Sequence, residues 1–349
     1  MKAVLLTGHG GLEKLVYRED VPDPVPGPAD VLVRVGAAGV NNTDLWTREG
    51  AYGVQDDPTK VSGWRREPLS FPVIQGADIV GTIVAVGEGV SADRIGERVI
   101  VDSALYTTNG DGLLDAGILG SERDGGFAEL VALPAANAHA IDSPLSDAEL
   151  ASFPTAYVTA ERMLRRARVD EGDTLLVTGA SGGVGTGLVQ LAKRRGAWVV
   201  AVVGPSKEDS IRAIGADAVI ARGAPMTAAV ERELGGRPLN VVADVVGGDT
   251  VGELLNLLCP GGRYVVAGAI AGAMATVDLR TIYLKQLDLL GSTMGDRSDF
   301  ARLLDAIESG VLKPLVAATY PLSELRRAQE DFISKRFVGK LVVIPQRIA

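Results

Sequence analysis

The most informative segment of the chain is Thr174-Leu-Leu-Val-Thr-Gly-Ala-Ser-Gly-Gly-Val-Gly-Thr-Gly-Leu-Val-Gln-Leu-Ala-Lys193. Residues 174–178 are apolar or β-branched, which is typical of a buried parallel strand. A glycine-rich turn follows, and apolar residues then recur at helical spacing from Val184 until Gly196 ends the helix. A helix that opens directly out of such a turn offers unpaired backbone N–H groups and the positive end of its dipole to a phosphate. The segment therefore predicts a pyrophosphate-binding site.

The glycine pattern of this turn departs from the strict dinucleotide fingerprint. Gly182 and Gly185 fill the second and third glycine positions, whereas Ala180 stands at the first. The context supports the interpretation, because strand–helix units follow one another after the turn. The residues expected to hold the cofactor are Ala180, Ser181, Gly182, Gly183, Val184 and Gly185. The alternative is a glycine-rich turn that holds no ligand.

The second half of the chain alternates strands with helices, which predicts a doubly wound parallel sheet of the Rossmann type. The expected strands are 174–178, 197–203, 218–220, 240–244, 263–268 and 287–292. The expected helices between them are 184–195, 207–214, 225–234 and 249–258.

The first part of the chain reads as mostly β. Short apolar runs at 1–6, 30–35, 79–86 and 97–101 lie between Gly and Pro clusters, which favours a compact barrel-like module. The tail has helices expected at 299–309 and 323–333 and a strand at 340–344, but no sheet of its own. We therefore expect an α/β protein with one domain made of residues 1–141 and 297–349 and a second made of residues 142–296.

Composition narrows the class of protein. A chain of 349 residues with 46% hydrophobic residues is long enough for two domains with separate cores. The net charge of −9 and the lack of a long Lys/Arg run argue against nucleic acid as a partner. One cysteine fits a reducing cytoplasm, and with only two histidines it leaves few ligands for zinc. The sequence shows neither a signal peptide nor an 18-residue apolar span, so we expect a cytoplasmic protein without a membrane partner.

The nucleotide preference depends on the residues after the second strand of the sheet. An NAD-specific fold places an acid there to bind the ribose 2′-OH, but this chain has none before Glu208. Ser206, Lys207 and Arg222 instead offer a hydroxyl and two cations suited to a 2′-phosphate, which predicts NADP(H). The alternative for both cations is an ordinary solvated surface charge. Residues expected to complete the cofactor site are Val245, Gly268, Ala269 and Ile270.

Four segments together resemble the medium-chain dehydrogenase/reductase superfamily over essentially the whole chain. They are Gly39-Val-Asn-Asn-Thr-Asp-Leu-Trp-Thr-Arg-Glu-Gly-Ala-Tyr52, the run 76–87 closing with Gly96-Glu-Arg-Val99, the turn 179–185, and Val338-Gly-Lys-Leu-Val-Val343. The resemblance implies a GroES-like catalytic domain, a Rossmann domain, and an active site in the cleft between them. It also implies a homodimer or homotetramer, commonly paired through the last Rossmann strand, here near 287–292.

The sequence departs from the zinc enzymes of that superfamily at the ligand positions. Those enzymes carry Cys-His in the first segment and Gly-His-Glu in the second, where this chain has Asn41-Asn42 and Gly76-Ala77-Asp78. We therefore expect no metal. The pattern Asn41-x-x-Asp-x-x-x-Arg-x-Gly-x-Tyr52 is similar to the zinc-free branch of quinone oxidoreductases and enoyl-thioester reductases.

Hydride transfer to a conjugated C=C leaves negative charge on the carbonyl oxygen, which hydrogen-bond donors must stabilise when no metal is present. Tyr52 matches the tyrosine that enoyl-thioester reductases use near the carbonyl, although a cleft-lining aromatic is an equal alternative. Asn41 offers an amide donor, or else bonds its own backbone in a turn. Asp44 and Arg48, four residues apart on a helix, are expected to pair with each other.

The segment 53–71 is longer than the loop expected before the Gly76 run. Trp64 and Arg65 within it, together with Trp46, are candidate substrate-binding residues. The alternatives are a solvated loop for the segment and a core position for Trp46.

We therefore expect a zinc-independent, NADPH-dependent reductase of α,β-unsaturated carbonyls or quinones that acts on a small molecule. The alternatives are a metal-independent NADP alcohol dehydrogenase and a non-catalytic, crystallin-like NADPH-binding protein.

Overall fold

The computed structural model describes residues 1–52, 68–106, 112–113 and 115–345. The chain forms two compact units. We call Met1–Thr155 with Leu304–Ala349 unit 1, and Ala156–Leu303 unit 2.

Unit 2 is built on a six-stranded sheet in the order β13-β12-β11-β14-β15-β16, with every neighbouring pair parallel. The strands are β11 (Thr174–Val177), β12 (Trp198–Val203), β13 (Ala218–Ala221), β14 (Val241–Asp244), β15 (Arg263–Val266) and β16 (Asp288–Gly291). All six predicted strands are confirmed within a few residues. The chain order reverses between β11 and β14, which is where doubly wound sheets bind ligands at their carboxyl edge.

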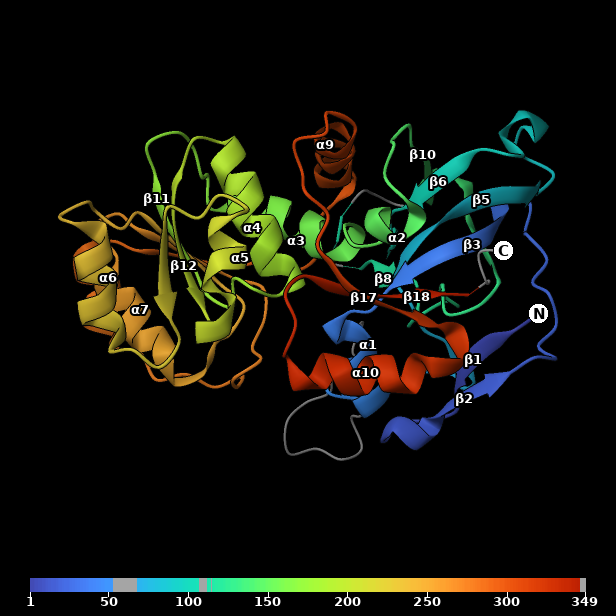
Figure 1. Cartoon of the computed structure of the whole chain (residues 1–349), viewed down its shortest axis with the longest axis horizontal. Coiled ribbons are helices and arrows are strands. Elements are labelled where there is room, and N and C mark those ends of the chain that lie inside the picture. The colour runs from blue at the N-terminus through green and yellow to red at the C-terminus, as the bar shows by residue number, and fades with distance from the viewer. Residues whose placement is uncertain (53–67, 107–111, 114, 346–349) are drawn as a thin grey trace. The chain divides into compact units, whose positions relative to one another are not determined.

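Helices cover both faces of this sheet. They are α3 (Pro154–Arg166), α4 (Gly183–Arg194), α5 (Glu208–Arg212), α6 (Met226–Leu234), α7 (Val251–Leu257) and α8 (Leu279–Lys285). The following helix, α9 (Arg297–Glu308), contains the point in the chain where unit 2 ends and unit 1 resumes. Figure 1 shows α4 on one side of β11 and β12, and α6 and α7 on the other. The sequence did not predict α8, and the structure gives the reason: none of its residues is buried, so it lacks an amphipathic signal.

Unit 1 is mostly β. Its largest sheet has the order β10-β6-β5-β3-β18-β17, with β9 also pairing with β3. Two smaller sheets have the orders β2-β1-β4 and β7-β8. The strands are β1 (Ala3–Leu6), β2 (Leu15–Arg18), β3 (Asp30–Gly39), β4 (Val73–Ile74), β5 (Asp78–Val86), β6 (Arg98–Val101), β7 (Ala104–Leu105), β8 (Gly117–Ile118), β9 (Leu130–Pro134), β10 (Ala138–Ala140), β17 (Val316–Pro321) and β18 (Lys340–Ile344).

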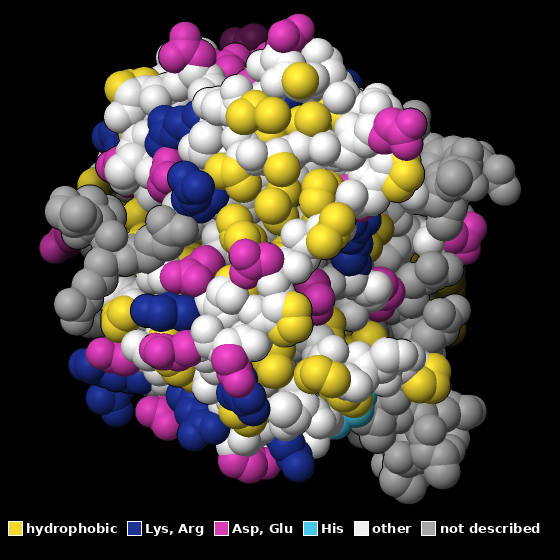
Figure 2. Space-filling model, turned by 90° about the vertical axis from the view of Figure 1, so that its right-hand side faces the viewer, with side chains coloured by type: hydrophobic (Ala, Val, Ile, Leu, Met, Phe, Trp, Pro, Cys, Tyr) yellow, Lys and Arg dark blue, Asp and Glu magenta, His cyan; other side chains and the backbone are white. Residues whose placement is uncertain are grey.

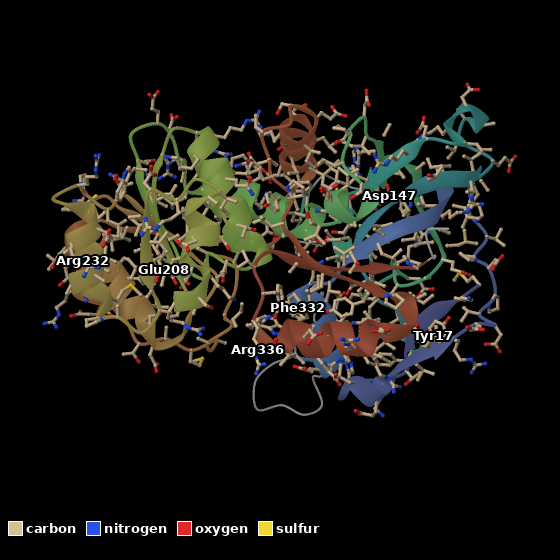
Figure 3. All side chains as sticks on the ribbon, viewed as in Figure 1. Tyr17, Asp147, Glu208, Arg232, Phe332 and Arg336 are labelled. Atoms are coloured by element: carbon tan, nitrogen blue, oxygen red, sulfur yellow. The ribbon has the colours of Figure 1, made fainter. Side chains whose placement is uncertain are left out.

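The tail returns to this sheet, as predicted, because β18 pairs antiparallel with β3 and parallel with β17. The helices of unit 1 are α1 (Asn42–Glu49), α2 (Asp147–Leu150) and α10 (Leu325–Ser334). Phe332, labelled in Figure 3, is a buried residue of α10 that packs into the core of unit 1 with Leu325 and Ala328.

The surface carries charges of both signs. On the face drawn in Figure 2, hydrophobic side chains gather in a band, and Lys, Arg, Asp and Glu alternate on either side of it. Within the described ranges, no helix has the length and hydropathy needed to cross a bilayer.

Candidate functional site

The glycine turn lies between β11 and α4, at the carboxyl edge of the unit 2 sheet. Gly179 is in the left-handed region, with φ +56°. Ala180 is fully buried, and its N–H donates to the Val202 carbonyl oxygen at 3.1 Å. The left-handed residue thus stands one position before Ala180, which explains why this turn tolerates alanine where the fingerprint has its first glycine.

The other two glycines of the pattern have different roles. A Cβ on Gly185 would lie 2.3 Å from the Gly179 carbonyl oxygen, so glycine is needed there to pack helix against turn. A Cβ on Gly182 would meet only that same oxygen, at 3.5 Å. Gly182 is the N-cap of α4, so its open side lies where a phosphate would approach the helix terminus.

These spacings predict the effect of Gly182→Ala. Gly182 has φ −82° and ψ 174°, which alanine adopts freely, so the free energy of unfolding is expected to change by about 1 kcal/mol or less. NADPH affinity, measured by fluorescence titration, is expected to fall about tenfold or more, because the methyl group separates phosphate from backbone. Gly8→Ala, at another uncrowded glycine, is the matched control. Unchanged affinity in Gly182→Ala would contradict a phosphate site at this turn.

The structure brings near each other two of the three residues predicted for a 2′-phosphate, Lys207 and Arg222. Lys207 lies in a short 3₁₀ helix, Pro205–Lys207, after β12, and its Nζ is 3.4 Å from Ser181 Oγ on the glycine turn. Arg222 follows β13, and its backbone N–H donates to the Val203 carbonyl oxygen at 2.6 Å. Partial burial, and secondarily the charge of Arg222, lowers the pKa of Lys207. Two cations held near each other favour binding of an anion.

A buried carboxylate, which the sequence analysis missed, supports the neighbouring loop. Asp244 is fully buried at the end of β14 and accepts hydrogen bonds from Thr178 Oγ1 and Tyr264 Oη, each at 2.5 Å. It also accepts from the backbone N–H groups of Val246 and Gly247, at 2.8 and 3.2 Å. Burial, followed by the charge of Asp244, raises the pKa of Tyr264, so the phenol remains a donor. The sequence did contain a signal for this hydrogen-bonded group, because the polar residues Thr178 and Asp244 stand at the carboxyl ends of the adjacent strands β11 and β14.

That loop lies against the glycine turn. A Cβ on Gly179 would be 3.0 Å from Val245 Cγ2, and one on Gly268 would be 2.8 Å from the Val245 carbonyl oxygen. Ala269 packs near Gly247, whereas Ile270 is 55% exposed. Val245 therefore contacts the glycine turn, and Gly268 and Ala269 contact the loop that carries Val245.

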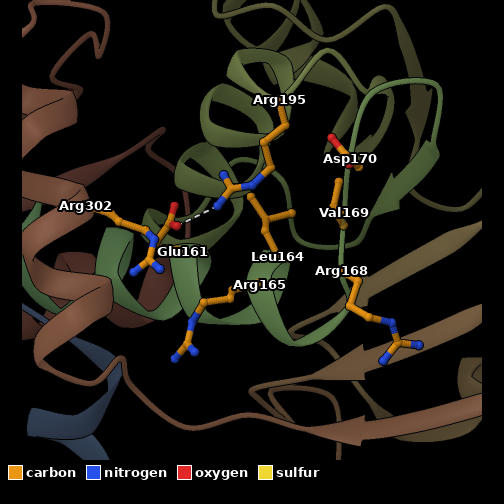
Figure 4. A pocket seen from close by; sticks show the side chains of 8 residues that line it. All are labelled: Glu161, Leu164, Arg165, Arg168, Val169, Asp170, Arg195 and Arg302. Carbon is orange, nitrogen blue, oxygen red and sulfur yellow. Dashed lines mark hydrogen bonds and ion pairs between the residues drawn. The ribbon is translucent and has the colours of Figure 1, made fainter.

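A hollow in unit 2, drawn in Figure 4, is a separate feature lined by four arginines. Apart from Arg302 on α9, its residues precede β11 or follow directly on α4, so it lies at the amino edge of the sheet, opposite the glycine turn. Arg195 pairs with Glu161 at 2.5 Å, and Arg168 pairs with Asp288. These guanidinium groups already have partners and do not converge in Figure 4, so they do not form an anion site.

A polar cluster in unit 1 joins three strands that are far apart in sequence. Lys340 Nζ donates to Asn41 Oδ1 at 2.5 Å and to Asp78 Oδ2 at 2.8 Å. Asp78 also accepts the backbone N–H of Thr155 at 2.7 Å. Gly39 pairs with both Asp78 and Val342 in the sheet, so this end of β3 brings the groups together. All three side chains of the cluster are buried.

Tyr52 and Trp46 lie together beside helix α1. The Tyr52 hydroxyl donates to Thr43 Oγ1 at 2.9 Å, and its ring meets the edge of Trp46 at 5.5 Å. Burial raises the pKa of Tyr52, which keeps its phenol protonated. Trp46 is half-buried against the core of unit 1. The candidates Trp64 and Arg65 lie outside the described residues.

The predicted pairing of Asp44 with Arg48 is wrong. Asp44 Oδ2 accepts the backbone N–H of Asn41 at 2.7 Å, because a carboxylate in the first turn satisfies a free N–H of the helix N-terminus. Arg48 instead donates to Gln329 Oε1 at 3.0 Å and to the Gly10 carbonyl oxygen at 2.6 Å. Burial raises the pKa of Asp44 to about 7.

Unit 2 is thus built on a Rossmann-type parallel sheet and unit 1 is β-rich, and comparisons with known proteins identify this combination of folds. The family model for the alcohol dehydrogenase GroES-like domain matches residues 27–143, and that for zinc-binding dehydrogenase matches residues 183–309. The chain belongs to the medium-chain dehydrogenase/reductase superfamily, a family of oxidoreductases.

Similar proteins cover nearly the whole chain. Acryloyl-coenzyme A reductase of Metallosphaera sedula is 33% identical over 98% of this chain and 99% of its own length. An NAD-dependent alcohol dehydrogenase of Sulfurisphaera tokodaii is 31% identical over 99% of this chain and 100% of its own. A solved structure from Sinorhizobium meliloti shares 58% identity with a TM-score of 0.96, covering 99% of this chain and 97% of that one.

The residues at the family's metal position do not fit zinc. The oxygen atoms of Asn41 and Asp78 both accept from the Lys340 ammonium, and a divalent ion bound to them would lie beside that positive charge. Within the described part of the chain, no group of three His, Cys, Asp or Glu side chains is placed to hold a metal ion.

Proposed function

We propose that this oxidoreductase is a zinc-independent, NADPH-dependent reductase of activated C=C bonds, with 2-enoyl thioesters, enones and quinones as candidate substrates. The observation that carries the proposal is the donor set of unit 1, in which an ammonium pairs with the residues at the metal position. Such a set supplies hydrogen bonds and positive charge but no Lewis acid. The similarity to acryloyl-coenzyme A reductase supports an enoyl thioester among the three.

The chemistry matches the donors and charges of these side chains. Bound NADPH would supply the hydride, and the carbonyl oxygen conjugated to the C=C would then gain negative charge. The Asn41 amide donates a hydrogen bond to that oxygen. The Tyr52 phenol, protonated because its pKa is raised, becomes the second donor when its hydroxyl turns from Thr43 Oγ1 to the substrate. Water or a side chain then delivers a proton to the α-carbon.

The preference for NADPH rests on the ribose end of the cofactor site. Lys207 lies beside Ser181 on the glycine turn and is close enough to Arg222 to feel its charge, which supports a role for both cations in binding a 2′-phosphate. Ser206, next to Lys207 in the sequence, offers a further hydroxyl group. NADH carries a 2′-hydroxyl group at this position and therefore has no 2′-phosphate to offer these two cations. The NAD-dependent relative makes a direct comparison of the two nucleotides necessary.

The test is a panel assay followed at 340 nm. Purified protein treated with a chelator is mixed with NADPH or NADH and an acyclic enone, a benzoquinone or crotonyl-coenzyme A. We expect oxidation of NADPH with at least one of these, at a rate that added zinc does not raise. No oxidation above background with any of them would reject the proposal.

Alcohol oxidation is the second candidate, and the similarity to an alcohol dehydrogenase favours it. It requires removal of a proton from the hydroxyl group, which needs a metal or a base of matched pKa. Tyr52 is a poor base because burial raises its pKa. Turnover of NADP⁺ with simple alcohols, and none with the activated alkenes, would favour this alternative.

We also propose that two copies pair through the edge formed by α8 and β16. β16 ends the sheet, and Tyr283, Leu284 and Leu289 are 63%, 71% and 46% exposed. A hydrophobic edge strand of this kind favours pairing with another chain. Leu284→Glu combined with Leu289→Lys is expected to convert a dimeric mass to a monomeric one in light scattering. A monomeric wild type, or an unchanged variant, would contradict this proposal.

A further inference from the structure

Unit 1 holds a buried cation in its polar cluster. Lys340 is at the start of β18 and is 3% exposed, and its ammonium contacts Asn41 and Asp78. A buried charge is retained only when it is paired and hydrogen-bonded. Asp78 provides the pairing charge and is itself fixed by the backbone N–H of Thr155. Asp78 therefore fixes the position of the Lys340 ammonium group.

The ammonium determines which way the Asn41 amide faces. An ammonium group has three donors and no acceptor, so the amide atom 2.5 Å from Lys340 Nζ must be the oxygen. The amide NH₂ then faces away from Lys340. Its nitrogen is 3.5 Å from the Gly39 carbonyl oxygen, the outer limit of a hydrogen bond, and that contact uses at most one of its two protons. Among the described residues no second acceptor contacts this nitrogen, so one of its protons is available for a substrate.

A neutral side chain in place of Lys340 would not enforce this orientation. Without the ammonium, the amide keeps only the capping-box contact of its oxygen with the backbone of Asp44 at the start of α1. That neutral contact holds the amide more weakly than a charged partner does, so the amide can turn over and present its oxygen, which repels the negative carbonyl oxygen formed during reduction. The backbone of Asn41 is held separately, since its N–H donates to Asp44 at 2.7 Å. Lys340 thus acts on the side chain of Asn41, not on the position of its Cα.

We propose that Lys340 is a positioning residue: it fixes the Asn41 amide with its NH₂ outward, so that this group donates to the substrate carbonyl oxygen. This inference rests on the proposed reductase function. It gives Lys340, near the C-terminal end of the chain, a role in the polar cluster of unit 1. Lys340 influences the reaction indirectly, by orienting the Asn41 amide that donates to the substrate.

The test is a double-mutant cycle between Asn41→Ala and the neutralised pair Lys340→Met/Asp78→Asn. Neutralising both partners avoids an uncompensated carboxylate. We expect kcat for the best alkene substrate to fall about a hundredfold in Asn41→Ala, and by at least tenfold in the neutralised pair. When the neutralised pair is introduced into Asn41→Ala, kcat is expected to fall no further than in Asn41→Ala alone. NADPH affinity is expected to stay within about twofold of the wild type in every variant, because the residues proposed to bind NADPH belong to unit 2.

A spectroscopic measurement gives a second readout that needs no turnover. In the dead-end complex with NADP⁺, the stretching band of a ¹³C-labelled substrate carbonyl reports hydrogen bonding to its oxygen. We expect a downshift in the wild type that is smaller in Asn41→Ala and in the neutralised pair, with the remainder due to the second proposed donor, Tyr52. If the neutralised pair does not give a cooperative melt, Lys340→Gln/Asp78→Asn replaces it, because glutamine has donors and an acceptor and so leaves the amide orientation open.

The outcomes separate the two proposals. A wild type that reduces no alkene or quinone rejects the proposed function. A wild type that does so, but in which neutralising the pair lowers kcat equally with and without Asn41, rejects the positioning role. An unchanged carbonyl band in the neutralised pair rejects it as well.

Discussion

Replacing Lys207 and Arg222 together by alanine is expected to weaken NADPH binding about a hundredfold or more, and to leave NADH binding within about threefold. Lys207 reaches Ser181 on the glycine turn, and Arg222 is close enough for its charge to act on Lys207. Each charge-assisted hydrogen bond to a phosphate is worth about 1.5–3 kcal/mol, so loss of two produces a large change in affinity. NADH carries a hydroxyl group in place of the 2′-phosphate, so its binding affinity is expected to change little.

The measurement is isothermal titration of both nucleotides against wild type and variant. Arg232→Ala is the matched control, because Arg232 is an exposed cation of unit 2 on α6, paired with Glu233 (Figure 3). Equal losses for the two nucleotides, or a wild type that prefers NADH, would contradict a 2′-phosphate site here.

Replacing Asp44 by asparagine is expected to remove a pH dependence of stability that runs opposite to that of most carboxylates. Burial raises the pKa of Asp44 from 3.8 to about 7 in the folded protein. Between these two values the folded state holds a proton that the unfolded state has released, so stability falls as the pH rises from about 4 to about 7. Asparagine keeps an oxygen that can accept the Asn41 N–H but does not ionise.

Chemical denaturation at pH 5 and pH 8 tests this directly. Relative to Asp44→Asn, the wild type is expected to lose about 2–3 kcal/mol of unfolding free energy between these pH values. The comparison cancels the contributions of other titrating groups, which both proteins share. If the difference in unfolding free energy between the two proteins is the same at pH 5 and pH 8, Asp44 remains ionised in the folded protein, and Lys340 supplies the compensating charge.

The short elements of unit 1 show where prediction from sequence ends. β3 and β5 were expected because their apolar runs are long enough to show a pattern. β4, β7 and β8 have two residues each, which is too short for any periodicity. β17 alternates half-buried and exposed residues and includes alanines and a proline, so its apolar signal is weak.

The candidate site divides in the same way. The turn 179–185, Lys207 and Arg222 could be proposed from sequence because each follows directly from a strand of an alternating sheet, whose carboxyl ends meet at one edge. Asp244 was missed although it stands at the same edge, because its role depends on Thr178 and Tyr264 in neighbouring strands. Arg48 was assigned to Asp44 through helix spacing, whereas its partner Gln329 is 281 residues away.

The sequence by itself determined the superfamily, the parallel sheet with its order of elements, and the chemistry available at the glycine turn. These depend on local pattern and spacing, which the chain carries in every conformation. Only the tertiary structure decided that Lys340 meets Asn41 and Asp78, at separations of 299 and 262 residues. The physical reason is strand pairing: β18 joins β3 in the folded sheet, and only there is the energetic cost of burying an ammonium offset by a carboxylate.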